Sequence, residues 1–191
     1  MNENGPKFNP DGLEEQSEDE KSGIRVEQID KLDEETLQQI LEVEKESFSG
    51  GMQDLEGLRN ILENKDGIHL CIRGEDNKIS GYISSLRQTQ EYSDLKNWDS
   101  DFENKNDNLY IDSIAVKPQN RNLESFNALI KTLASKAVEG KYKKIAMHAR
   151  TSNNFSSILQ KRYGAKFIRR LENWYNFGEP FDYLEIELPE E

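Results

Sequence analysis

The chain has 191 residues, with 37 acidic and 25 basic side chains and a net charge of −12. An acidic surface argues against general nucleic-acid binding, which needs a basic face, and fits either simple solubility or a partner that is a cation or an amine. The single cysteine, Cys71, excludes an internal disulfide framework and fits a reducing cytoplasm. No run of consecutive apolar residues approaches the length of roughly 20 that a membrane span needs, so we expect no membrane partner.

The N-terminal stretch 1–22 is polar and acidic and contains Gly5, Pro6, Pro10 and Gly12. Its apolar residues are too sparse to offset the entropy of ordering, so it is predicted to be a disordered acidic tail. It lacks a basic region followed by an apolar one and is therefore not a secretory signal. Residues 23–191 are predicted to form one domain, which begins with a strand over 24–29.

Two helices are predicted next. Asp33 is suited to cap the first, in which apolar residues recur at steps of three and four up to Phe48, with Glu44 among them. The glycine pair 50–51 interrupts the pattern, and a second helix is predicted over 53–63. Two strands, 68–73 and 78–86, then form a hairpin around the turn 74–77.

The apolar residues of the segment 88–107 follow neither a helical nor a strand period, and the segment contains six acidic residues and two lysines. The sequence therefore predicts an acidic loop insertion, and a loop of this length usually has a role. Two interpretations stay open. The segment is either an acidic, aromatic flap near an amine acceptor or a mobile surface insertion anchored by Trp98.

The central stretch runs from Leu109 to Lys136 and predicts a buried strand that stops near Pro118, a tight turn, and a helix over 122–138. A further apolar strand, 144–150, should lie parallel to the first, as in a right-handed βαβ crossover. A short helix over 154–162 is predicted to end at Gly164. Strands over 165–174 and 181–188 complete the chain.

The central turn carries Val116-x-Pro118-x-x-Arg121 in front of a helix, which resembles motif A of the GNAT N-acyltransferase superfamily. The family pattern is Arg/Gln-x-x-Gly-x-Gly/Ala. Arg121 matches its first position, whereas Glu124 and Phe126 stand at the two glycine positions. Asn153 matches the first position of the family's motif B. The element order β-α-α-β-β-β-α-β-α-β-β is also that of the family, over residues 24–188.

The resemblance implies an α/β (α+β) fold with a GNAT-like mixed sheet of about seven strands flanked by about four helices. It also implies acetyl-CoA as co-substrate. Backbone groups of the central strand would bind the acyl and pantetheine arms, and the turn would bind the pyrophosphate. The implied cofactor-binding residues are Ile114, Ala115, Val116, Arg121, Asn122, Leu123, Glu124, Ser125, Phe126 and Asn153.

Acetyl transfer to an amine needs a base for the amine and a proton donor for the leaving thiolate. Asp112 and His148 are the candidate bases, and Tyr163 is the candidate proton donor. Each has a structural alternative: Asp112 as a solvated or N–H-bonded carboxylate, His148 as a hydrogen-bonded core residue, and Tyr163 as a ring packed against the last strands. No Cys/His cluster has metal-ligand spacing, and neither a serine-hydrolase elbow nor a P-loop motif is present.

Two segments resemble those that border the acceptor in the family: the helix junction 47–52 and the aromatic stretch 172–181, which contains two glutamates. The second is equally explained as a cluster that closes the core. The predicted function is transfer of an acetyl group from acetyl-CoA to a primary amine of a small molecule or a protein, by direct attack in a ternary complex. The departures at Glu124 and Phe126 motivate an alternative, an inactive binding or regulatory module that has lost coenzyme A binding. The expected location is cytoplasmic.

Overall fold

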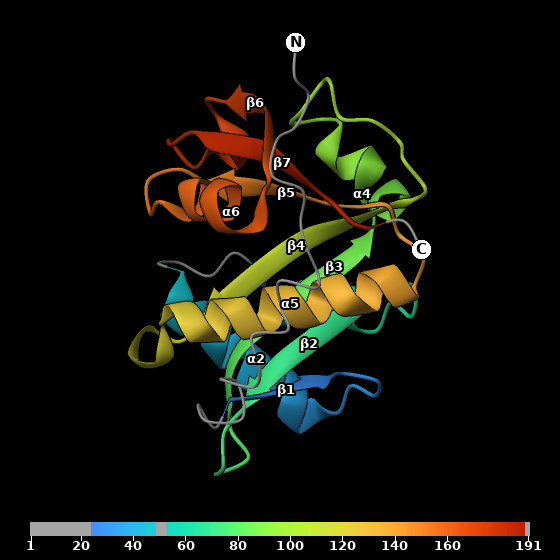
Figure 1. Ribbon diagram of the computed structural model, residues 1–191. Helices are drawn as coiled ribbons and strands as arrows, with labels where there is room; N and C mark the ends of the chain where they lie inside the picture. Colours follow the sequence, from blue (N-terminus) through green and yellow to red (C-terminus); the bar gives the residue numbers. More distant parts are fainter. Residues whose placement is uncertain (1–23, 49–52, 190–191) are drawn as a thin grey trace. The chain divides into compact units, whose positions relative to one another are not determined.

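The computed structural model describes residues 24–48 and 53–189 (Figure 1). Seven strands form a mixed sheet in the order β1-β2-β3-β4-β5-β7-β6. The strands are β1 Arg25–Gln28, β2 Ile68–Arg73, β3 Ile79–Arg87, β4 Asn108–Val116, β5 Lys144–Arg150, β6 Lys166–Leu171 and β7 Phe181–Glu187. The helices are α2 Glu34–Ser47, α3 Leu55–Leu62, α4 Gln88–Leu95, α5 Leu123–Glu139 and α6 Phe155–Tyr163, with short 3-10 helices at Pro118–Asn120 and Trp174–Asn176.

The described residues belong to two compact units. We call residues 24–48, 53–86 and 112–136 the N-terminal unit, and residues 87–111 and 137–189 the C-terminal unit. The predicted tail 1–22 and the glycine pair 50–51 lie outside the described residues. The predicted seven strands, the mixed sheet and the α/β class are confirmed.

The N-terminal unit is built on the β1–β2–β3 antiparallel arrangement and the helix pair α2 and α3. Asp33 caps α2 as predicted, because its Oδ1 accepts from the Thr36 amide at 2.7 Å. Asp54 caps α3 in the same way through the Gly57 amide at 2.8 Å. The core of this unit contains Leu37, Ile40, Leu41, Val43, Leu58, Leu62, Cys71, Ile79, Tyr82 and Ala115. These residues come from the apolar faces that the sequence periodicity indicates.

The C-terminal unit contains the predicted parallel pair of strands. Residues 108–110 of β4 pair with residues 144–146 of β5, and β7 lies antiparallel between β5 and β6. Helix α6 packs on β5 and β7. It ends at Gly164, whose φ of 64° is left-handed, as the sequence predicts for a glycine that terminates a helix. The core of this unit is aromatic and contains Leu95, Phe102, Tyr110, Ala146, Trp174, Phe181 and Tyr183.

The expected loop over 88–107 is wrong in its first part, because α4 occupies Gln88–Leu95. The helix brings the expected four helices to five among the described residues. Its buried residues are Gln88 at the start and Leu95 at the end. The buried Gln88 side chain donates to the Glu103 carbonyl at 2.7 Å and accepts from Asn108 Nδ2 at 2.9 Å. An apolar period therefore could not reveal this helix.

The strand expected over 165–174 is shorter than predicted and ends at Leu171. Trp174 lies in a 3-10 helix, and Tyr175 and Asn176 adopt left-handed φ values of 47° and 57° that no strand permits. Among the residues that the structure describes, no helix is both long and apolar enough to cross a bilayer.

Candidate active site

The connection from β4 to α5 lies wholly in the N-terminal unit and carries every predicted site residue from Asp112 to Phe126. Strand β4 ends at Val116, and Pro118 opens a 3-10 turn, as expected for a residue with no amide to donate. The Lys117 amide donates to the Ser80 carbonyl at 2.8 Å, and the Asn120 amide donates to the Lys117 carbonyl at 2.9 Å. The turn is therefore tied both to β3 and to itself.

The strand residues that precede the turn differ in burial: Ile114 is half-buried, whereas Ala115 and Val116 are buried. A Cβ added at Gly81 would lie 3.0 Å from the Ala115 carbonyl oxygen and from a Val116 methyl group. Only glycine at this position of β3 permits so close an approach without displacing backbone.

Arg121 is exposed, and its guanidinium group lies over the end of β4. It donates to the Val116 carbonyl from Nε at 3.4 Å and from Nη2 at 3.3 Å, and to the Ser47 carbonyl at 3.5 Å. The same Val116 carbonyl accepts from the Ser47 hydroxyl at 3.1 Å. This predicted donor-binding carbonyl is thus already engaged by side chains of the protein.

Asn122 caps α5, because its Oδ1 accepts from the Ser125 amide at 2.7 Å. The buried Ser125 hydroxyl donates to the Asn120 carbonyl at 3.1 Å. Leu123 and Glu124 occupy the first turn, where no carbonyl of the helix can accept from their amides, and no side chain caps these two amides in the part of the chain that the structure describes. This arrangement fits an anion at the helix N-terminus.

At the two positions where the family pattern has glycine, this chain has Glu124 and Phe126, near the N-terminus of α5. Glu124 is exposed in the first turn, and Phe126 is half-buried. A carboxylate in a first turn stabilises the helix through the macrodipole, but it also repels an anionic ligand. The site therefore has amides suited to a phosphate, together with a charge that opposes its binding.

Asp112 is half-buried, and its Oδ2 accepts from the Ser84 hydroxyl at 3.3 Å. The next residue, Ser113, accepts from the Tyr82 hydroxyl at 3.0 Å. Tyr82 and Ser84 are two apart on β3 and share one face, whereas adjacent residues of a regular strand point to opposite faces. Strand β4 therefore departs from regular alternation at 112–113, and its residues 112–114 are all half-buried.

A second carboxylate beside Ser113 was not identified from the sequence. Glu44 on α2 is fully buried, and its Oε1 accepts from the Ser113 hydroxyl at 3.0 Å and from the Tyr82 hydroxyl. The available signal was its place in the apolar stripe of the first helix, where a charged residue has no solvent to face. Burial and the neighbouring Glu44 charge raise the pKa of Tyr82 well above its usual value.

Two predicted site residues, Asn153 and Tyr163, belong to the C-terminal unit. Asn153 is exposed, and its Oδ1 accepts from the Phe155 amide at 3.0 Å at the start of α6. Tyr163, at the end of α6, is buried, and burial raises its pKa to about 12. A tyrosine in this state keeps its proton at neutral pH.

His148, the other candidate base, lies in a buried polar chain of the C-terminal unit. Its Nδ1 is 2.8 Å from the Tyr110 hydroxyl, and its Nε2 is 3.2 Å from Asp99 Oδ2. Burial lowers the pKa of His148 to about 4, so the ring is neutral at pH 7. The neutral ring fits both contacts if Tyr110 donates to Nδ1 and Nε2–H donates to Asp99. These contacts support the structural alternative for His148.

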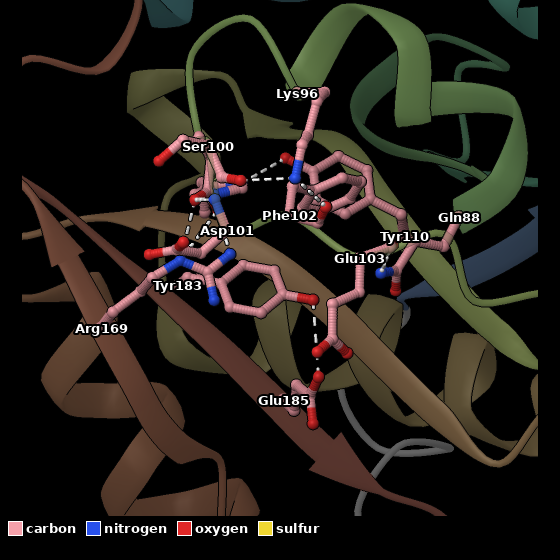
Figure 2. Close-up of polar contacts among 12 residues, drawn as sticks. Gln88, Lys96, Ser100, Asp101, Phe102, Glu103, Tyr110, Arg169, Tyr183 and Glu185 are labelled. Atoms are coloured by element: carbon pink, nitrogen blue, oxygen red, sulfur yellow. Dashed lines mark hydrogen bonds and ion pairs between the residues drawn. The ribbon is translucent and has the colours of Figure 1, made fainter.

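The same chain continues to Arg169, whose Nε is 2.9 Å from Asp99 Oδ1 and whose guanidinium group lies against the Tyr183 ring at 4.3 Å (Figure 2). Burial by itself raises the pKa of Asp99, but hydrogen bonds from His148 and Arg169 bring it down to about 2. Figure 2 also shows Lys96 directed at the carbonyls of Ser100 and Phe102. Residues 96–102 are thus fastened by polar contacts of Lys96 and Asp99.

The acidic and aromatic segments of the sequence meet in this unit. Trp98 stacks on Tyr175 with 4.7 Å between ring centroids, and the Tyr175 hydroxyl donates to Asp94. Trp174 is buried and stacks on His148 at 3.7 Å. Trp98 therefore anchors the 88–107 segment, as one interpretation expects, and residues 172–181 help to close the core.

Comparisons with known proteins agree with this architecture. The family model for the acetyltransferase (GNAT) family matches residues 33–174, which is more than half of the chain. No curated protein sequence matches. Among residues 24–48 and 53–189, no group of three or more histidine, cysteine, aspartate or glutamate side chains is arranged to hold a metal ion.

Several solved structures share the fold at low sequence identity. The ribosomal-protein-S18-alanine N-acetyltransferase from Escherichia coli is 13% identical, with a TM-score of 0.65 over 88% of this chain and 97% of its own. Arabidopsis thaliana NAA60 in complex with acetyl-CoA is 19% identical, with a TM-score of 0.64 over 85% and 96%. An aminoglycoside 6′-N-acetyltransferase complexed with coenzyme A is 11% identical, with a TM-score of 0.66 over 87% and 99%. Taken with the family match, the mixed sheet and the β4–turn–α5 segment establish that this chain belongs to the GNAT acetyltransferase family.

Proposed function

We propose that this protein transfers an acetyl group from acetyl-CoA to a primary amine, by direct attack of the amine in a ternary complex. The observation that carries the proposal is the β4–turn–α5 segment, in which two first-turn amides of a 17-residue helix lie next to Arg121. Family membership supports the reaction class, and two structures of the same fold contain acetyl-CoA or coenzyme A.

In this proposal the N-terminus of α5 holds the pyrophosphate of acetyl-CoA. The amides of Leu123 and Glu124 donate to the phosphate oxygens, and Arg121 supplies positive charge. Backbone groups of Ile114 and Ala115 bind the acyl and pantetheine arms. Asn122, Ser125, Phe126, Val116 and Asn153 stay predicted contacts of the donor.

The proposed chemistry requires that the amine lose its proton before it attacks, because only the neutral nitrogen has a free lone pair. The nitrogen–carbon bond forms, the carbon–sulfur bond breaks, and the thiolate takes a proton. Asp112, oriented by Ser84, is the proposed base. Tyr163, a phenol that is protonated at neutral pH, is the proposed donor to the thiolate.

The acceptor class is a primary amine of a small molecule or a protein. Both kinds occur among proteins of this fold, since one is named for aminoglycosides and another for the alanine of ribosomal protein S18. An acidic chain suits a cationic acceptor. We also propose that the protein works in the cytoplasm and that residues 23–191 form the catalytic domain, preceded by a disordered tail over 1–22.

The test is thermal unfolding of the full chain with and without millimolar acetyl-CoA, followed by a transfer assay. Acetyl-CoA at 100 times its dissociation constant should stabilise the protein by about 2.7 kcal/mol. Kanamycin and a peptide with a free N-terminal alanine serve as probe acceptors, and coenzyme A release is measured. An unchanged unfolding temperature would defeat the proposal.

One set of contacts favours a second candidate, a binding or regulatory module that has lost coenzyme A binding. Asn122 already accepts from the Ser125 amide, and the Glu124 carboxylate is exposed beside the remaining amides. Replacing Glu124 and Phe126 with glycine separates the two candidates. The enzyme is stabilised by acetyl-CoA before the change and binds it more tightly afterwards, whereas a module that these two side chains have closed gains binding only in the glycine variant.

A further inference from the structure

The N-terminal unit contains a carboxylate that the proposed mechanism does not use. Glu44 is fully buried near the end of α2, next to the apolar side chains of Ile40, Leu41 and Val43. Burying an ionised carboxylate is costly unless hydrogen bonds compensate it. Glu44 is held in this position by the donors at its Oε1, and the identity of those donors indicates what it does.

Three side-chain oxygen atoms from three elements meet at this point. The hydroxyl of Tyr82 on β3 donates to Glu44, and the hydroxyl of Ser113 on β4 is 3.0 Å from both Glu44 Oε1 and the Tyr82 oxygen. Such a cluster conducts a proton by small shifts along hydrogen bonds. Ser113 is therefore bonded directly to the buried carboxylate.

Of these three side chains, only Ser113 is half-buried, since Glu44 and Tyr82 have no exposed area. Ser113 lies in the irregular part of β4, between the proposed base Asp112 and the strand residue Ile114 that would bind the acyl donor. Ser113 is therefore the one of the three residues that has exposed area. The charges of Glu44 and Asp112 both act on the Tyr82 hydroxyl, and the Cys71 thiol belongs to the same core cluster as Tyr82.

We propose that Glu44, reached through the Ser113 hydroxyl, is a second acceptor beside Asp112 for the proton that the acceptor amine loses before it attacks acetyl-CoA. This role rests on the proposed acetyltransferase function. An ammonium N–H bond breaks, Ser113 Oγ takes that proton while it releases its own to Glu44 Oε1, and the nitrogen keeps the lone pair. The carboxylate becomes neutral, and the reverse path returns the proton to solvent after product leaves.

The environment of Glu44 suits a proton acceptor. Its apolar neighbours oppose the ionised carboxylate by desolvation, and the two donors at Oε1 favour it. Tyr82 keeps its own proton because its pKa is raised well above the usual value, and it acts as a fixed donor rather than as a competing base. Ser113 would contact the amine, whereas Glu44 acts through Ser113 as a positioning and proton-storing residue.

The first experiment needs no acceptor and does not depend on acetyl-CoA binding. Infrared spectra of the full chain are recorded against pH, and the spectrum of Glu44→Gln is subtracted to isolate the carboxyl C=O band of Glu44. We expect the intensity of this band to change with pH, because the proposed role requires Glu44 to gain and lose a proton. We also expect its protonation to slow or shift in Ser113→Ala. A band that is constant between about pH 5 and 8 overturns the inference.

The second experiment measures the pH dependence of kcat/KM with acetyl-CoA and the alanine peptide or kanamycin. Glu44→Gln and Ser113→Ala should each lose about 100-fold or more at neutral pH, and the loss should shrink as pH rises and the free amine becomes abundant. Asp112→Asn is the matched comparison. If Asp112→Asn alone changes the profile, Glu44 is not the acceptor. If acetyl-CoA neither binds nor reacts, the proposed function fails, and the infrared titration still decides whether Glu44 exchanges a proton through Ser113.

Discussion

The buried histidine of the C-terminal unit leads to a prediction about stability against pH. Burial lowers the pKa of His148 from 6.5 to about 4, and the Asp99 hydrogen bond only partly offsets this effect. The folded protein therefore keeps the ring neutral, while the unfolded chain protonates it below pH 6.5. Because the unfolded state binds more protons in this range, stability falls as pH drops from 6.5 to about 4 and then levels off.

The magnitude follows from the two pKa values. Each pH unit of difference corresponds to about 1.4 kcal/mol, so the fall from 6.5 to about 4 corresponds to about 3 kcal/mol. The free energy of unfolding of a typical domain is about 5–15 kcal/mol, so this contribution is a large part of it. His148 should therefore contribute strongly to the acid sensitivity of the protein above pH 4, together with His69, whose pKa burial also lowers, whereas the Asp99 carboxyl, with a pKa of about 2, keeps its charge there.

Urea unfolding of the wild type and of His148→Gln at several pH values between 7 and 4 measures this effect. We expect the free energy of unfolding to decline by about 3 kcal/mol less in His148→Gln than in the wild type. His69→Gln is the matched control, since His69 is a buried histidine of the other unit and its replacement should leave the His148 contribution in place. Parallel curves for the wild type and His148→Gln would refute the reasoning.

Two further predictions concern single contacts. Asp99→Ala should lower the free energy of unfolding in urea by about 3–5 kcal/mol, because it leaves Arg169 without its buried partner, whereas Asp101→Ala, at an exposed neighbour, should cost about 0.5 kcal/mol or less. A loss at Asp99 no larger than at Asp101 would contradict the pairing. Asn122→Ala should cost about 1 kcal/mol of stability through loss of the helix cap, yet strengthen acetyl-CoA binding in the thermal-shift assay by releasing the Ser125 amide. Weaker binding would argue that Asn122 itself contacts the donor.

Much of the fold was predictable because local physics decides it. The alternation and apolar runs of the strands, the Asp33 cap and the left-handed Gly164 all depend on residues close in the chain. The parallel pairing of β4 with β5 followed from a helical connection between two apolar strands. Helix α4 escaped prediction because the buried Gln88, rather than an apolar face, fixes it through distant carbonyl and amide groups.

The candidate site was predictable only in part. The turn and helix start that contain Arg121 and Asn122 were found from their spacing, whereas the Glu44–Ser113 contact joins residues 69 positions apart. His148 was considered as a base from its residue type alone, and its contact with Asp99, 49 positions away, places it in a buried structural chain instead. Residue type indicates what a group can do, but only its neighbours set its charge and its access to solvent.

The sequence by itself determined the order of the strands and of the helices other than α4, the parallel central pair, and the turn that precedes α5, since hydrophobic period, caps and proline act over a few residues. Only the tertiary structure decided that Ser113 bonds a buried carboxylate, that Asn122 caps its own helix, and that His148 is neutral. The reason is that hydrogen-bond partners and desolvation depend on side chains brought together from distant parts of the chain, which no local pattern records.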